Sequence, residues 1–395
     1  MRINRYRTGP VRQSSRRRSG CLSLVILFGV LIGLVLSTWG RLGELFSVAE
    51  TNQTESGLRA AQRAFDRGDL DTAVDLARQT WRDEPDNTAA LILLVRALIY
   101  RSYSDYNHDL DRKSALQLTA AAFEVSPRNA DVLASYAFAL QANGDPLRAS
   151  QYAQRALSHD SDHTLARVTL AMSYGGVGGY ENALKESQRA VAQAGDYGVD
   201  VQRALAISYG DLGRYREAIR AIDVAISYNN KLALLHFERA LYAILAGDTD
   251  IATTSYFNVL AFDAENIKAR LRMCELSSLL RESERALQYC IEVTTRAPGW
   301  VDGWHQLGRE YYLLGQFESA RMALNRCTSL AIAQDIPILE RPFECWFLQG
   351  QAAEILGDCE SLRKVYAEFQ QMAAAADLPQ TWVYPPEGPT ICLNN

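Results

Sequence analysis

Residues 301–315 read VDGWHQLGREYYLLG, and the pattern in this stretch decides the fold. An apolar pair with one small member, Leu307-Gly308, is followed two turns of helix later by Gly315. Glycine suits this position because the chain often leaves a helix through a residue in the left-handed conformation. Ala320 comes five residues later, where a small side chain would let a second helix pack closely on the first. The stretch therefore predicts a helical hairpin.

The same plan recurs about every 34 residues across residues 54–376. Each unit predicts a first helix, a turn and a second helix that carries a small residue near its start. The turn glycines are Gly68, Gly144, Gly178, Gly213, Gly247, Gly315 and Gly357. The small residues are Ala73, Ala149, Ala183, Ala218, Ala252 and Ala320. The units span residues 54–87, 88–129, 130–163, 164–198, 199–232, 233–266, 267–300, 301–334 and 343–376.

Some segments depart from the repeat. The seventh unit has Arg281 in place of the turn glycine, and the ninth has Leu362 where alanine is expected. The second unit carries extra residues between its helices, at 102–109, rich in tyrosine and acidic side chains. We expect this insert to be a protruding surface loop, with a partner contact as one alternative. Residues 377–395 contain four prolines and no helical period, so we expect a loop-like tail.

The pattern resembles the tetratricopeptide repeat. The resemblance implies an all-α fold, an α-solenoid of about nine helix hairpins that wind as a right-handed superhelix. It also implies binding of a protein or peptide on the concave face, which is lined by positions 2, 5, 9 and 12 of the first helices. The alternative is that these side chains pack on neighbouring repeats or on the tail. Those positions include Phe138, Gln141, Val168, Met172, Arg203, Ile207, Phe237, Leu241, Ile244, Lys268, Leu271, His305, Arg309 and Tyr312.

Some members of that family clamp a C-terminal carboxylate with lysine, arginine and asparagine side chains. Lys268 and Arg272 match part of this pattern, and Arg203 stands at another of its places. However, Ile207 and Glu238 replace the asparagines, and Glu238 would repel a carboxylate. The sequence therefore disfavours a clamp of this kind.

The N-terminal segment predicts a membrane anchor. Residues 1–20 contain seven arginines and no acidic residue, and residues 21–39 read CLSLVILFGVLIGLVLSTW without a charge. A helix of that length spans about 28 Å, close to the ~30 Å of the hydrocarbon core. The arginines should stay in the cytoplasm, which places residues 54–376 outside it, after a juxtamembrane linker at residues 40–53. A cleaved signal peptide is the alternative, although small residues at 47–49 lie far beyond the apolar run.

Charge and motifs disfavour several functions. Residues 21–395 carry 34 basic and 46 acidic side chains, a net charge of −12, which argues against nucleic acid as a partner. No motif of a serine hydrolase, a phosphate-binding loop or a zinc protease is found. The cluster His159–His163 and the acidic stretch 105–111 resemble metal-binding sequences, but solvent-exposed turns are the better interpretation of both segments. We therefore expect no enzyme activity, cofactor, metal or small-molecule substrate.

Six cysteines lie outside the apolar run, all in the last third of the chain. An even number in an extracytoplasmic segment predicts disulfides, with buried free thiols as the alternative. The repeat frame that the resemblance implies places Cys274 and Cys290 on facing helices of one unit, and Cys327 and Cys345 on neighbouring helices of two units. The remaining pair would be Cys359 and Cys392.

These expectations define three hypotheses for function. The first is a scaffold that holds a partner protein at the outer face of the cell membrane. The second is a regulatory or substrate-recruiting subunit of a cell-envelope enzyme complex. The third is an assembly factor with reversed topology, facing the cytoplasm.

Overall fold

The computed structural model describes residues 57–377, 382–385 and 388–392. The expected membrane helix at residues 21–39, its basic flank and the linker lie outside these ranges. The described residues from Leu58 onwards belong to one compact unit. Within the described ranges, no helix combines the length and the apolar character that crossing a membrane requires.

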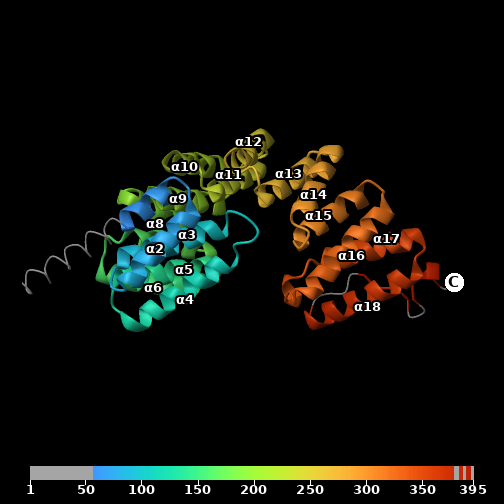
Figure 1. Ribbon diagram of the computed structural model, residues 1–395, viewed down its shortest axis with the longest axis horizontal. Coiled ribbons are helices and arrows are strands. Elements are labelled where there is room, and N and C mark those ends of the chain that lie inside the picture. Colours follow the sequence, from blue (N-terminus) through green and yellow to red (C-terminus); the bar gives the residue numbers. More distant parts are fainter. Residues whose placement is uncertain (1–56, 378–381, 386–387, 393–395) are drawn as a thin grey trace, which may run out of the picture. The chain divides into compact units, whose positions relative to one another are not determined.

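The described part of the chain is all-α, as predicted, and consecutive helices pair as hairpins (Figure 1). The first hairpin consists of helical residues 57–66 and α2. The helices that follow are α2 (Leu70–Asp83), α3 (Thr88–Ser102), α4 (Leu110–Val125), α5 (Ala130–Ala142), α6 (Pro146–His159), α7 (Thr164–Gly176), α8 (Tyr180–Val191), α9 (Gly198–Asp211), α10 (Tyr215–Tyr228), α11 (Ala233–Ala246), α12 (Thr249–Phe262), α13 (Ile267–Leu279), α14 (Ser283–Arg296), α15 (Val301–Leu313), α16 (Phe317–Ala333), α17 (Phe343–Leu356) and α18 (Cys359–Ala375).

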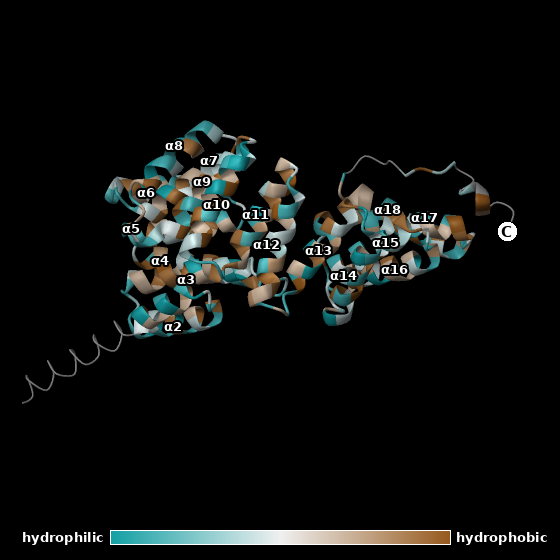
Figure 2. Cartoon of the chain, turned by 90° about the horizontal axis from the view of Figure 1, so that it is seen from above, coloured by the Kyte–Doolittle hydropathy of each residue, from teal (hydrophilic) through white to brown (hydrophobic). Residues whose placement is uncertain are grey.

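Small residues hold each hairpin together. The alanines that follow the turn glycines, from Ala73 to Ala320, are completely buried. A Cβ atom built on Gly308 would lie 2.5 Å from Leu324 Cγ, so α15 and α16 approach too closely for any larger residue there. Hydrophobic and hydrophilic residues alternate along most helices (Figure 2), as expected for helices that bury one face.

The turns require the left-handed conformation in every unit from the sixth to the ninth. Gly247, Gly315 and Gly357 have φ angles of 78°, 72° and 72°. Arg281, which replaces the glycine of the seventh unit, takes the same conformation with a φ of 60°. A side chain with a Cβ atom is strained there, so this turn keeps the repeat geometry at a cost in stability.

Substituting Arg281 with glycine should therefore raise the free energy of unfolding by about 1 kcal/mol. Urea unfolding of the two proteins would measure the difference. The matched control is Gly315→Ala in the next unit, which should lower the free energy of unfolding by a similar amount. An unchanged or lower stability for Arg281→Gly would show that the turn is not strained.

Helix α3 occupies the inner side of the first units. Nearly all its residues are buried, which explains why its sequence is apolar all round. Its central arginine, Arg96, pairs with Asp200 of α9 at 2.6 Å, although 104 residues separate them. In the same region, Asn229 donates a hydrogen bond of 2.8 Å to the carbonyl of Phe65, so the first hairpin meets the end of the fifth. The inner face of units one to five is thus closed by the chain itself.

The described tail packs on the last hairpin. Trp382 is buried against aromatic rings of α17 and α18. Gly350 of α17 leaves the space for its ring, since a Cβ there would come within 2.1 Å of a Trp382 carbon. Residues Thr390–Cys392 form a short 3-10 helix. Residues 382–385 and 388–392 of the tail contain no α-helix, and Trp382 covers an apolar face of the last hairpin.

Candidate partner-binding surface

Helices α11, α13 and α15 each carry an exposed leucine at or next to their last residue. These leucines are Leu245, Leu279 and Leu313, and their side chains are 50%, 61% and 62% exposed. They recur every 34 residues, at the same place in three successive units. Leu279 and Leu313 line a pocket of about 440 Å³. We call it the α11–α15 pocket; its lining residues are Ile244, Tyr256, Arg272, Glu275, Leu276, Ser278, Leu279, Arg281, Arg309 and Leu313.

The α11–α15 pocket combines apolar side chains with an excess of positive charge. Three arginines line it, against one acidic residue, Glu275. Glu275 pairs with Arg272 at 2.6 Å, and Arg309 approaches Glu344 at 3.7 Å. The pocket is therefore basic within a body whose net charge is strongly negative. Such a surface suits a segment that offers apolar and acidic side chains together.

Several residues expected on the concave face lie at or near this pocket. Ile244 and Arg309 line it, and Leu241 is exposed one turn before Leu245 on α11. The ring of Tyr312 is half-buried and lies edge-on against Phe317. His305 contacts Glu344 at 3.0 Å.

Other residues expected on the concave face are enclosed. Phe138, Met172 and Leu271 are buried, and Ile207 packs against the same core as the first two. For these residues the structure therefore fits the alternative, in which the side chains pack on neighbouring repeats. For Phe138, Met172 and Ile207 the physical reason is the closure described above, in which α3 fills the inner face. Leu271 packs instead in a separate cluster with Tyr106 and Trp300.

The remaining expected residues contact other parts of the chain. The guanidinium of Arg203 is held by the carboxylate of Glu238, with a shortest distance of 2.7 Å. The ammonium of Lys268 donates to the carbonyl of Tyr103 at 2.9 Å and lies 5.1 Å from the ring centre of Phe237. Burial, together with repulsion from Arg272, lowers the pKa of Lys268 to about 8. Arg203 and Lys268 are thus engaged internally and leave no carboxylate clamp.

Leu279, Leu313 and Arg281 are among the pocket residues that sequence reasoning missed. They lie at or just after position 13 of a unit, beyond the positions assigned to the concave face. A signal was present, because an apolar residue that recurs every 34 residues near a helix end predicts either a core contact or a common exposed surface. A second signal in the sequence was Arg281, because an arginine in place of the turn glycine marks an unusual position of the repeat.

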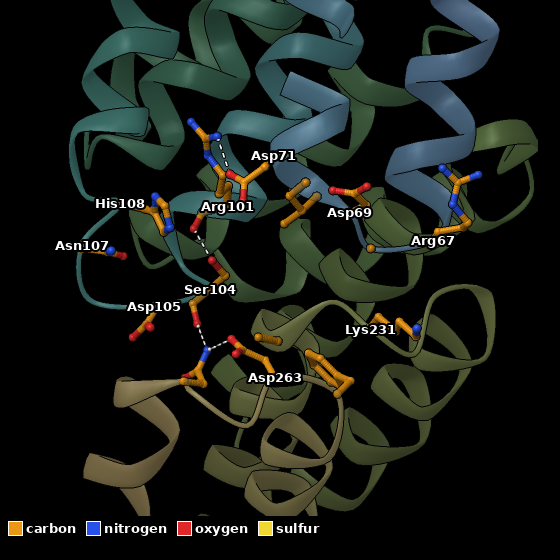
Figure 3. A pocket seen from close by; sticks show the side chains of 15 residues that line it. Arg67, Asp69, Asp71, Arg101, Ser104, Asp105, Asn107, His108, Lys231 and Asp263 are labelled. Atoms are coloured by element: carbon orange, nitrogen blue, oxygen red, sulfur yellow. Dashed lines mark hydrogen bonds and ion pairs between the residues drawn. The ribbon is translucent and has the colours of Figure 1, made fainter. Parts of the chain in front are cut away.

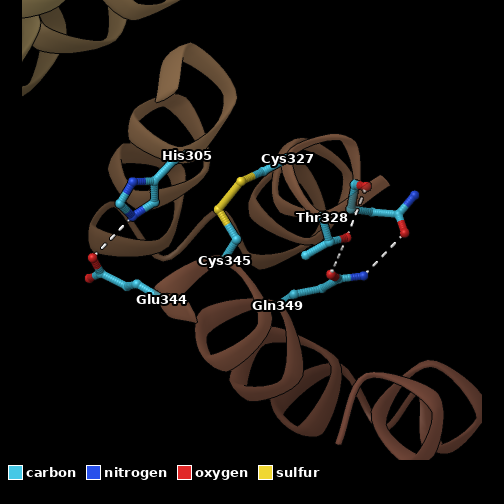
Figure 4. Close-up of a disulfide and its surroundings, with 7 residues drawn as sticks. His305, Cys327, Thr328, Glu344, Cys345 and Gln349 are labelled. Atoms are coloured by element: carbon cyan, nitrogen blue, oxygen red, sulfur yellow. Dashed lines mark hydrogen bonds and ion pairs between the residues drawn. A yellow bond between two sulfur atoms is a disulfide. The ribbon is translucent and has the colours of Figure 1, made fainter. Parts of the chain in front are cut away.

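Three disulfides join the six cysteines of the last third. They are Cys274–Cys290, Cys327–Cys345 and Cys359–Cys392, with Cα atoms 5.5, 6.3 and 5.5 Å apart. These are the pairs that the repeat frame suggested. Figure 4 shows the second of them, which links α16 to α17 between the His305–Glu344 contact and the hydrogen bond from Thr328 to Gln349.

A second, polar pocket of about 400 Å³ lies where the first hairpin, the insert and the loops before α11 and α13 meet (Figure 3). Its acidic side chains already have partners. Asp71 pairs with Arg101 at 2.8 Å, Asp69 caps α2, and Asp263 accepts a hydrogen bond from Asn266. The pocket is therefore built from contacts that hold the surrounding segments together.

The two stretches with the look of metal sites contribute to helix ends. His163 accepts from the amide of Ala166 in the first turn of α7, and its ring also contacts Asp131 at 3.0 Å. Asp105 contacts the first turn of α13. In the parts of the chain that the structure describes, no group of three or more His, Cys, Asp or Glu side chains is arranged to hold a metal ion.

Residues 301–331 match the sequence profile of the tetratricopeptide repeat. The chain is similar to a chain in the crystal structure of the APC/C hetero-tetramer Cut9-Hcn1, with a TM-score of 0.55 and 13% identity over 74% of this chain. It spans only 54% of that chain's length. A structure of the human IFIT1 dimer with PPP-AAAA gives a TM-score of 0.50 and 14% identity, over 78% of this chain and 69% of that one.

A tetratricopeptide repeat protein from Parabacteroides merdae is 18% identical over 66% of this chain and 99% of its own, with a TM-score of 0.40. No curated protein matches the sequence. At these identities the first two structures show the fold alone, an α-solenoid. The profile match adds that residues 301–331 form a tetratricopeptide repeat.

Proposed function

We propose that this chain is a scaffold, anchored in the cell membrane by residues 21–39, which binds a partner protein in the α11–α15 pocket on the extracytoplasmic side. The observation that carries the proposal is the surface made by Leu279, Leu313 and three arginines. Exposed apolar side chains that gather at one place on a soluble surface mark interaction sites. The arginines select a partner segment with acidic residues beside its apolar ones.

The membrane anchor and the orientation rest on two independent features. Seven arginines precede an uncharged run of anchor length, which favours a cytoplasmic N-terminus. Three disulfides in the solenoid favour an oxidising compartment, because such bonds are rare in the cytosol. The third hypothesis, a body that faces the cytoplasm, would leave these bonds unexplained.

The proposed activity is binding without catalysis, cofactor or small-molecule substrate. A regulatory or substrate-recruiting subunit of a cell-envelope enzyme complex would use the same pocket, so this second function differs only in the partner. The acidic body disfavours nucleic acid.

A negative charge introduced into the pocket should strongly weaken partner binding. With full-length protein extracted from its own membrane, Leu279→Glu and Leu313→Glu should reduce the recovery of co-purified partner at least tenfold, because each places a carboxylate on an apolar contact. The matched control is Leu147→Glu on α6, whose leucine is also exposed but lies in another unit. Equal recovery with all three variants would contradict the proposed pocket.

A further inference from the structure

The insert between α3 and α4 does not protrude, contrary to expectation. It reaches α13, more than 160 residues along the chain. Both oxygens of the Asp105 carboxylate accept hydrogen bonds from backbone amides of the first turn of α13: Ile267 at 3.3 Å and Lys268 at 3.0 Å. The first amides of a helix have no partner within it, and its N-terminus favours negative charge. The insert thus provides a carboxylate that this helix end can bind.

Residues on both sides of Asp105 also make contacts. The carbonyl of Tyr103 accepts from Lys268 Nζ at 2.9 Å, and the carbonyl of Ser104 accepts from Asn266 Nδ2 at 3.0 Å. Backbone contacts of this kind do not depend on the side chains of the bound segment. They would therefore be available to any extended segment placed there.

An aromatic side chain completes the contact. The ring of Tyr106 stacks on Trp300, with ring centres 4.9 Å apart and planes inclined by 26°. Both rings pack against a small apolar cluster formed by Ile267, Leu271, Val293 and Ala297. Stacked aromatic pairs add to the apolar area that they bury.

Four consecutive residues, 103–106, therefore contact α13 and its surroundings as a bound peptide would. The two backbone carbonyls and the aromatic ring meet one matching group each, and the carboxylate meets two backbone amides. Lys268 was expected on the concave face, and Arg272 of the α11–α15 pocket lies one turn further along α13. The insert thus covers one end of a surface whose other end is open.

We propose that the N-terminal end of α13, with Asn266, Lys268 and Trp300, is a recognition site for an extended protein segment that carries an acidic residue followed by an aromatic one. The chain's own insert occupies this site, and a partner segment gains access by displacing it. The inference rests on the proposed function, since it names the chemistry of the partner and a control on its binding. The insert acts as a competitive internal ligand for this site.

The test uses a fluorescein-labelled peptide of the insert, residues 101–109 (RSYSDYNHD), added to full-length protein in detergent. The variant Asp105→Ala/Tyr106→Ala removes the two side chains that hold the insert but leaves the site intact. We expect it to bind the peptide at least ten times more tightly than the wild type, as measured by fluorescence polarisation. A peptide with alanine at both positions should not bind, and Trp300→Ala in the variant should abolish binding.

The matched control is Leu110→Ala, which changes an exposed residue just beyond the insert and should leave the site occupied. If circular dichroism shows that the double variant is unfolded, Tyr106→Ala alone keeps the Asp105 contacts and replaces it. The proposal would be contradicted if the peptide bound equally to the wild type and the variant, or if it bound to neither at millimolar concentration. The insert would then be a fixed structural contact and not a displaceable ligand. Because this assay needs no natural partner, it can fail or succeed independently of the capture experiment at Leu279.

Discussion

Replacing Asp200 with alanine should lower the free energy of unfolding by about 3–5 kcal/mol, because it leaves a buried guanidinium without its counter-charge. The side chains of Arg96 and Asp200 are only 4% and 1% exposed, and their charged atoms are 2.6 Å apart. Tyr100 donates a second hydrogen bond to the same carboxylate, at 3.1 Å. The alanine variant would lose both contacts at once.

The charge on Arg96 cannot be relieved by losing its proton. An arginine guanidinium stays protonated at any pH at which proteins are studied. In the intact pair, attraction to Asp200 raises the pKa of Arg96 overall, although burial opposes the charge. The rings of Phe65 and Tyr197, with centres 4.7 and 4.9 Å from the guanidinium carbon, would be the groups left around the cation. They compensate a buried charge only in part.

Urea unfolding followed by circular dichroism would measure this loss. The control is Asp223→Ala, which removes the partner of Arg239 in a pair of the same length but with the carboxylate half exposed. That change should cost less than about 1 kcal/mol. If Asp200→Ala cost no more than the control, the closure of units one to five would not depend on the buried pair.

Removing the Cys327–Cys345 disulfide by a double alanine substitution should destabilise the last units by about 3 kcal/mol, because the bond closes a short loop and restricts the unfolded chain. Its sequence separation is 18 residues. The effect should stay local, since a repeat couples mainly to its neighbours. Three of the six tryptophans, Trp304, Trp346 and Trp382, lie in the last two units and the tail, so about half of the tryptophan fluorescence signal reports on this region.

The bonds themselves can be read by non-reducing peptide mapping of protein purified from its own membrane. We expect the three pairs described above and no alkylatable thiol among those six cysteines. Six free thiols would remove the main support for an extracytoplasmic body. Other pairings would leave the compartment unchanged but would contradict the packing of the last three units.

Local features of the fold could be predicted from the sequence because they repeat. Turn glycines such as Gly315 and anchors such as Ala320 set hairpin boundaries, and these boundaries in turn placed Cys327 next to Cys345. Each of these relations connects residues within one unit or two neighbouring units. A residue type that recurs at the same position of successive units was enough to predict these relations.

The inner face could not be predicted in the same way. The closure of units one to five depends on Arg96 meeting Asp200, and the position of the insert depends on Asp105 meeting α13. Both contacts join residues more than 100 positions apart, and no periodic pattern encodes them. Phe138 and Met172 were therefore placed on the concave binding face, whereas the folded chain buries them.

If the α11–α15 pocket holds a partner protein, site-specific photo-crosslinking in intact cells will capture that partner. A photoreactive phenylalanine analogue at position 279 or 313 should yield one discrete adduct after irradiation, with the same partner from both positions. The same analogue at position 147 should yield none. A partner in the α11–α15 pocket would be ruled out if positions 279 and 313 gave no adduct, or if all three positions gave the same adducts.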